Sequence, residues 1–246
     1  MTADRWTRTV RQQVGLGRLL PLGGPHDGAW LAEAAAGAVL RDAARNVPGV
    51  RPGRVRIALA DPEDTTDPVV PPPPGALPPG PLRVTADFAA TATEPLPETA
   101  SRLRTALSTA ATHRLGLRVT KVDLRVTDLW ESQDAAGSEA PADATDGGHP
   151  PADVRDSDSG DAGRVARAVL AVPGVAGLTG VPARRPVGFW EAATDGDPAL
   201  PRRHVQVQIA VRADHRALHV AREVRARTGE LLPDRPTVTV LVTAVE

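Results

Sequence analysis

The chain has 246 residues with 29 basic and 30 acidic side chains, so it has no overall field that would attract nucleic acid or an anionic membrane. Cysteine is absent, which excludes disulfides, thiolate nucleophiles and zinc sites built on sulfur. The sequence contains neither an apolar run of the roughly 20 residues that cross a bilayer nor a signal-peptide segment, so we expect a cytoplasmic location.

The tetrapeptide VPGV ends two runs rich in alanine and arginine, at residues 47–50 and again at 172–175. The first run, DGAWLAEAAAGAVLRDAARNVPGV, predicts a helix from residue 28, with Asp27 as its N-cap. Its inward positions recur every four residues: Leu31, Ala35, Val39 and Ala43. Proline cannot continue a helix and glycine readily takes a positive φ, so each PG pair predicts a helix end and a turn.

A first α+β domain is predicted over residues 28–130, after an N-terminal extension of residues 1–27. Alternating apolar residues predict strands in RVRIALA, PLRVTADFAATA and RVTKVDLRVTDLW, and an amphipathic helix in LPETASRLRTALSTAATHRLGL. Residues 61–81 are too rich in proline to pair within a sheet and predict a long loop. The predicted element order is α-β-β-α-β.

A second, divergent repeat of this unit is predicted over residues 164–246, beyond a disordered acidic linker at 131–163. Its helix RVARAVLAVPGV, strand HVQVQIAV, helix DHRALHVAREVRARTGELL and strand TVTVLVTAVE keep the earlier order, with a degenerate stretch where the first strand and proline loop stood. We therefore expect an α+β fold of two tandem units, each a small antiparallel sheet with two helices on one face. Sheets this small leave edges that can join each other or another chain.

The segments GAWLAEAAAGAVLRDAARNVPGV and LGLRVTKVDLRVTDL resemble the first helix and the last strand of the alkaline-shock, or envelope stress response, family of Gram-positive bacteria. The resemblance covers about residues 28–129, and the whole chain resembles a tandem, divergent member of actinobacterial type. It implies a cytoplasmic, non-enzymatic scaffold or adaptor that reaches the inner face of the membrane only through small membrane-embedded proteins. Related envelope stress proteins and further copies of the chain are the other expected partners.

The sequence predicts no catalytic, cofactor-binding or metal-ligating residue. His215 and His219 have a spacing that could share a metal on a helix, but no third ligand is visible, and two surface histidines are the simpler interpretation. The alternative function is a nucleic-acid-binding module of KH-like α/β units. The glycines at 174–180 could supply its clamp loop, but Pro182 and Pro186 argue against the helix that should follow.

One stretch, PARRPVGFWEA, carries the predicted partner contact: Arg184, Arg185, Phe189 and Trp190. Exposed aromatic residues beside arginines are typical of partner surfaces. The same aromatic residues could instead plug the end of a small core, and the sequence does not decide between these two interpretations.

Overall fold

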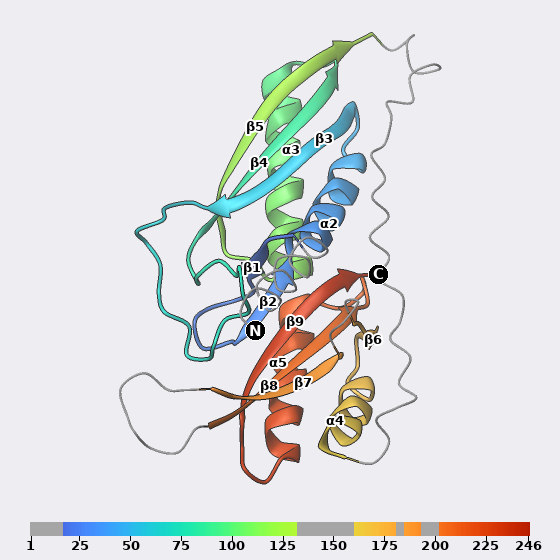
Figure 1. Ribbon diagram of the computed structural model, residues 1–246. Coiled ribbons are helices and arrows are strands. Elements are labelled where there is room, and N and C mark those ends of the chain that lie inside the picture. The colour runs from blue at the N-terminus through green and yellow to red at the C-terminus, as the bar shows by residue number, and fades with distance from the viewer. Residues whose placement is uncertain (1–16, 132–159, 181–184, 193–201) are drawn as a thin grey trace, which may run out of the picture.

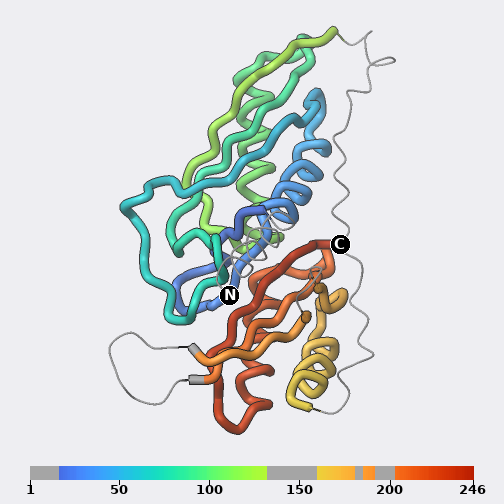
Figure 2. Tube along the Cα trace, in the orientation of Figure 1, coloured from blue at the N-terminus to red at the C-terminus, as the bar shows by residue number. Residues whose placement is uncertain are grey.

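The computed structural model describes residues 17–131, 160–180, 185–192 and 202–246, which form a mixed α/β protein (Figure 1). Within these residues the chain has four α-helices and two sheets, one of three strands and one of six. The two sheets lie at opposite ends of the molecule, as the Cα trace shows (Figure 2). The predicted mixture of helices and strands is confirmed.

The three-stranded sheet has the order β3-β4-β5 and two helices on one face (Figure 1). Its elements are α2 (Glu33–Arg45), β3 (Val50–Leu59), β4 (Leu82–Thr91), α3 (Leu96–Thr109), the π-helical turn η1 (Ala110–Leu115) and β5 (Val119–Trp130). The central strand alternates between a buried face and a more exposed one, with Leu82, Val84, Ala86, Phe88 and Ala90 turned toward the helices. This alternation is what the apolar pattern of the sequence predicts.

The six-stranded sheet has the order β1-β2-β9-β8-β6, with β7 also paired to β8. Its elements are β1 (Leu19–Pro21), β2 (Ala29–Ala32), α4 (Asp161–Leu170), β6 (Val175–Leu178), β7 (Val187–Ala192), β8 (Arg202–Val211), α5 (Ala217–Leu231) and β9 (Thr237–Val245). Helix α4 begins inside the region predicted as linker, and most of that region, 132–159, lies outside the described residues.

The expectation of antiparallel sheets is wrong for one strand pair within each predicted unit. Strands β3 and β4 are antiparallel, but β4 and β5 run parallel, and so do β8 and β9. In each parallel pair a helix lies between the two strands in the sequence and returns the chain to the end from which it started. The observed order α2-β3-β4-α3-β5 therefore contains a mixed sheet.

The N-terminal strands correct the predicted start of the first helix. Helix α2 begins at Glu33, and its N-cap is Ala32 rather than Asp27. Residues 29–32 instead form β2, which runs parallel to β9 at the other end of the chain. All four residues of β2 are buried, including Trp30 and Leu31 on its opposite sides, which a helix with one exposed face would not allow.

The proline-rich segment packs against the six-stranded sheet. Thr239 on β9 donates its hydroxyl to the Pro71 carbonyl at 3.1 Å, and Trp30 donates its indole N–H to the Leu77 carbonyl at 3.3 Å. The backbone N–H of Leu77 bonds in turn to the Leu19 carbonyl on β1. A loop from the first half of the sequence thus covers the β1 edge of the other sheet.

Both VPGV turns end helices as predicted. Gly49 follows α2 with φ +73°, and Gly174 follows α4 with φ +88°. Added Cβ atoms would lie only 2.6 Å from Thr91 Cγ2 and 2.7 Å from the His215 ring, respectively. Each position therefore requires glycine for its conformation and for the close approach of a neighbour.

Candidate protein-interaction site

The edge of the six-stranded sheet is interrupted beside β8. Strands β6 and β7 pair with successive parts of β8, leaving Gln208 between them. At this break the Gln208 carbonyl accepts the Thr179 N–H at 3.1 Å, and the Gln208 N–H donates to the Pro186 carbonyl at 2.9 Å. The interruption preserves the backbone hydrogen bonds of β8 but leaves the surface above it open.

A notch of about 110 Å³ lies at this break. It is lined by Arg185, Gly188, Phe189, Trp190, Gln206 and Gln208, which we call the β7 notch. Gly188 faces Gln206 across the β7–β8 pair and has no side chain to cover it. An added Cβ would meet only Trp190 Cζ3, at 3.8 Å, so the opening is a consequence of the glycine.

Two of the predicted contact residues, Phe189 and Trp190, lie on strand β7, and Arg185 lies just before it. Phe189 and Trp190 are neighbours on β7, so they point to opposite faces of the sheet. Arg185, Phe189 and Trp190 all line the notch, whereas Arg184 lies outside the described residues.

Of the two predicted roles, filling the core and contacting a partner, Phe189 fits the first and Trp190 fits the second. Phe189 packs against the hydrophobic core, and the Arg203 guanidinium lies 4.4 Å from its ring centre. Trp190 remains 40% exposed on the other face and covers the His204 ring at a centroid distance of 4.5 Å. Only Trp190 therefore offers a large aromatic surface to a partner.

Two buried polar atoms near Trp190, Gln208 Oε1 and His204 Nε2, have no hydrogen-bond partner among the described residues. The Gln208 side chain lines the notch, although the residue is only 2% exposed. An unpaired buried acceptor costs about 1–3 kcal/mol, which a ligand that donates an N–H or O–H would recover. In the sequence these residues form a polar series, His204, Gln206 and Gln208, that alternates with buried valines and does not by itself indicate a site.

His204 lies beneath Trp190 as a neutral ring. Its Nδ1 is 2.6 Å from the Thr237 hydroxyl, and burial lowers its pKa to about 4. At neutral pH the ring therefore carries no charge that would repel Arg185 or a basic ligand.

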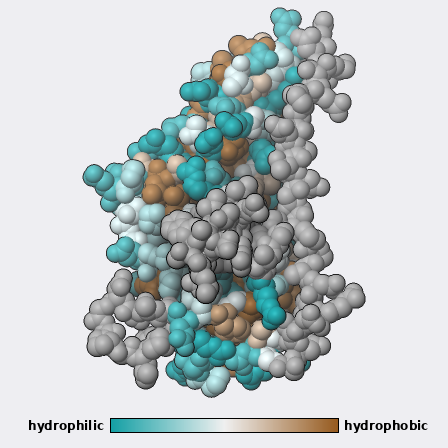
Figure 3. Space-filling model, viewed as in Figure 1, coloured by the Kyte–Doolittle hydropathy of each residue, from teal (hydrophilic) through white to brown (hydrophobic). Residues whose placement is uncertain are grey.

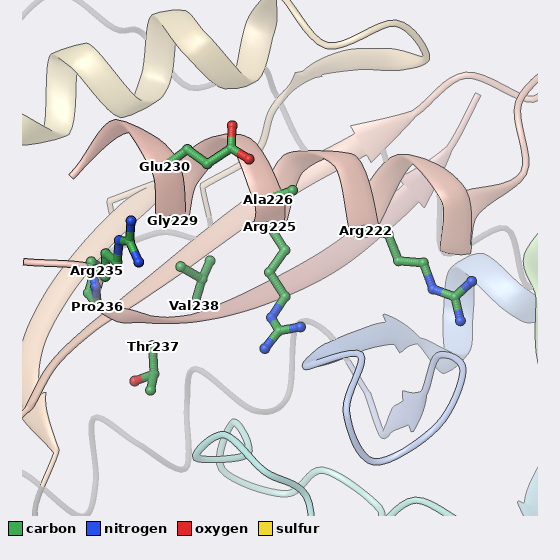
Figure 4. A pocket seen from close by; sticks show the side chains of 9 residues that line it. All are labelled: Arg222, Arg225, Ala226, Gly229, Glu230, Arg235, Pro236, Thr237 and Val238. Carbon is green, nitrogen blue, oxygen red and sulfur yellow. The ribbon is translucent and has the colours of Figure 1, made fainter. Parts of the chain in front are cut away.

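A wider depression of about 680 Å³ lies between α5 and the start of β9 (Figure 4). Three arginines, Arg222, Arg225 and Arg235, line it. Arg222 already makes two hydrogen bonds to the Asp27 carboxylate, and Arg225 donates to the His26 carbonyl at 2.7 Å. Two of the three arginines thus hold the β1–β2 turn against α5, which leaves them engaged within the chain rather than available to a ligand.

The other sequence candidates take ordinary structural roles. His215 precedes α5 and contacts Asp214 at 2.8 Å, while His219 lies in the first turn of the helix. The described residues contain no cluster of three or more potential metal ligands. The glycine-rich stretch at 174–180 forms a turn and strand β6, and the next element among the described residues is strand β7 rather than a helix.

On the face shown in Figure 3, hydrophobic residues form small patches among hydrophilic ones. Within the described part of the chain, no helix has the length and apolar character needed to cross a membrane.

Comparison with protein-family models, curated proteins and solved structures gave no match.

Proposed function

We propose that the chain is a non-enzymatic adaptor that binds an extended segment of a partner protein along β7. The observation that supports this most directly is the unpaired Gln208 Oε1, buried in a notch beside the exposed Trp190. Buried polar side-chain atoms usually have a hydrogen-bond partner, so an unpaired acceptor beneath an opening is a place where a ligand can donate a hydrogen bond.

Strand addition supplies the binding mode. Strand β7 pairs with β8 on one side, and within the described residues its other side has no partner strand. An added strand gains main-chain hydrogen bonds, while pockets for alternate side chains give selectivity. Because Gly188 leaves the route to Gln206 open, one partner side chain can cross β7 and donate to Gln208 Oε1. Trp190 would pack against the next side chain on that face.

The cellular role that we propose is envelope stress response. The resemblance of residues 28–129 to the alkaline-shock family supports it, and so does a tandem arrangement of two α-β-β-α-β units. The order and pairing of α4, β6, β8, α5 and β9 parallel those of α2, β3, β4, α3 and β5, which favours that arrangement. The partners would be small membrane-embedded proteins, which would hold this chain at the inner face of the membrane.

Binding of synthetic peptides tests the proposal. The peptides would represent the cytosol-facing segments of small membrane proteins from the source cell. We expect Gly188→Leu, which fills the notch, and Trp190→Ala to abolish binding seen with the unaltered chain. Gly177→Leu is the matched control, because Gly177 lies on β6 of the same edge and a Cβ there meets nothing within 4 Å. Equal binding by the Gly188 and Gly177 variants would refute the notch as the binding site.

A nucleic-acid-binding function is the second candidate, and one surface favours it. The face of the β3-β4-β5 sheet turned away from the helices carries Arg51, Arg54, Arg56, Arg83, Lys121 and Arg125, against Asp87, Asp123 and Asp128. Arg51 also lies 4.2 Å from the ring centre of Trp130, a surface on which a base could stack. Titration with a uridine homopolymer at several salt concentrations tests this. Each lost phosphate contact, for example in Arg56→Glu, should reduce the salt slope by roughly 1.

A further inference from the structure

Strand β5 is the open edge of the three-stranded sheet. It is 12 residues long and, among the described residues, pairs only with β4. The opposite edge, β3, is blunted because the Ile57 N–H donates to the Glu33 carboxylate at 3.1 Å. In Figure 1, β5 lies at the outer margin of its sheet, with no other labelled element beyond it. A long open edge is a template for pairing with another strand.

The two faces of β5 carry different chemistry. Its register with β4 places Val122, Leu124 and Val126 on the helix-covered face, opposite Val84, Ala86 and Phe88. Lys121, Asp123 and Arg125 lie on the outer face. Val126 is 40% exposed, and Val122 and Leu124 are half-buried, so these side chains have room for apolar neighbours on the open side.

The backbone of the same apolar residues faces the open edge. The Val122 carbonyl accepts a side-chain hydrogen bond from Arg104 Nε at 3.3 Å. Along a strand the N–H and C=O groups of a residue point to one side, and this direction alternates with each residue. The backbone groups of Val122, Leu124 and Val126 therefore face an incoming strand.

We propose that a second copy of the chain pairs with β5 in antiparallel register about a two-fold axis at Leu124. Leu124 then faces Leu124 of the second copy, and Val122 faces Val126 in both directions. On the outer face Asp123 faces Arg125, again in both directions, and Lys121 faces Thr127. Apolar pairs on one face and opposite charges on the other are the cross-strand pairs that stabilise sheets.

Neighbouring registers lose this complementarity. A shift by one residue places apolar side chains opposite charged ones. A shift by two residues in one direction places Asp123 against Asp123 and Lys121 against Arg125, and in the other direction it places Arg125 against Arg125. Like charges directly opposite each other destabilise a strand pair. Among these neighbouring registers the charge order of β5 therefore selects the one centred on Leu124. The three-stranded sheets of the two copies then become one continuous sheet with the isologous symmetry of a C2 dimer.

Charge exchange tests the register in the full chain by sedimentation equilibrium. We expect the unaltered chain to dimerise, and Asp123→Arg and Arg125→Asp to be monomeric, since each opposes like charges. A mixture of the two single variants should form a heterodimer, because it restores both opposite-charge pairs. Circular dichroism of each variant checks that it folds. A monomeric unaltered chain, or single variants that dimerise as before, would overturn the proposal.

A disulfide tests the two-fold axis independently, because the sequence contains no cysteine. Cα atoms that face each other in hydrogen-bonded antiparallel pairs are about 5.5 Å apart, within the range of a disulfide. Leu124→Cys should therefore oxidise to a covalent dimer, whereas Val122→Cys should not, because its partner is Val126 of the second copy. A covalent dimer from Val122→Cys but not from Leu124→Cys would overturn the register.

Discussion

The Ile57 backbone N–H donates to the Glu33 carboxylate at 3.1 Å, so the first residue of α2 blocks the edge of β3. We predict that Glu33→Ala lowers the free energy of unfolding by about 1–3 kcal/mol, because the buried Ile57 N–H loses its acceptor. Glu33→Gln keeps an acceptor oxygen and should lose less than half as much. Urea unfolding measures both, and an equal loss in the two variants would mean that the edge hydrogen bond is not the cause.

The pH dependence of stability should follow His204. Burial lowers its folded-state pKa to about 4, while the unfolded ring titrates near its ordinary value of 6.5. Between these values the unfolded chain binds the extra proton, so stability is full above pH 6.5 and falls as the pH decreases toward 4. The loss should be on the order of 3 kcal/mol.

Replacement of that ring checks the assignment. His204→Phe should remove the loss of stability between pH 6.5 and 4, whereas the exposed His219→Asn should retain it. Thermal unfolding across this pH range provides the measurement. An unchanged profile in His204→Phe would show that another group titrates.

The ion pair between Asp27 and Arg222 joins the β1–β2 turn to α5, with N–O distances of 2.7 and 3.1 Å. Burial alone would raise the pKa of Asp27, but hydrogen bonds from Arg222 and from the Gly24 N–H outweigh it and lower the pKa below 3.8. The ionised Asp27 carboxylate therefore stabilises the folded chain at a pH above the pKa of Asp27 in the unfolded chain. This stabilisation is lost as the pH falls through the lower pKa of Asp27 in the folded chain.

We expect Asp27→Asn to cost about 1 kcal/mol at pH 7, because Arg222 is largely exposed, and to cost less below pH 4. Glu223→Gln breaks the exposed pair with Arg227 and should cost only about 0.3–0.5 kcal/mol. Urea titrations at both pH values compare the variants. An equal loss of unfolding free energy in Asp27→Asn and Glu223→Gln would mean that the Asp27–Arg222 pair stabilises the fold no more than an exposed pair within one helix.

Trp30 tests the placement of β2 beside β9. The side chain is 1% exposed and its indole donates to Leu77, so Trp30→Ala should cost about 3–5 kcal/mol. It should also speed hydrogen exchange in β9, the parallel neighbour of β2. Trp130→Phe, at the half-exposed end of β5, is the control and should change β9 little. Unaltered exchange in β9 after Trp30→Ala would contradict the pairing.

Periodicity predicted the helices and long strands because each has one buried face. The valines of β8 and the leucines of α3 repeat at the spacing of their elements, and the PG pairs mark where α2 and α4 end. Residues 29–32 were wrongly predicted as helix because β2 is buried on both sides and shows no alternation. Periodicity cannot distinguish such a short apolar run beside alanines from a helix. The apolar pattern also could not predict whether paired strands run parallel or antiparallel, because side chains alternate in the same way in both.

The candidate site was predictable only in part. The composition around Arg185 and Trp190 indicated a contact surface, but the sequence did not reveal that this segment is a strand or that its two aromatic side chains point apart. Gln208 was missed because polar residues that alternate with valines normally lie on a solvated face. Its burial depends on tertiary packing, which the local pattern does not encode.

Site-specific photo-crosslinking in the source cell tests the adaptor function most directly. A photoreactive residue in place of Arg185, on the exposed rim of the β7 notch, should form an adduct that mass spectrometry identifies as a small membrane protein. The same residue in place of Gly177, on the neighbouring strand β6, should not. Absence of an adduct at position 185, or the same adducts from both positions, would contradict binding of a partner at the notch.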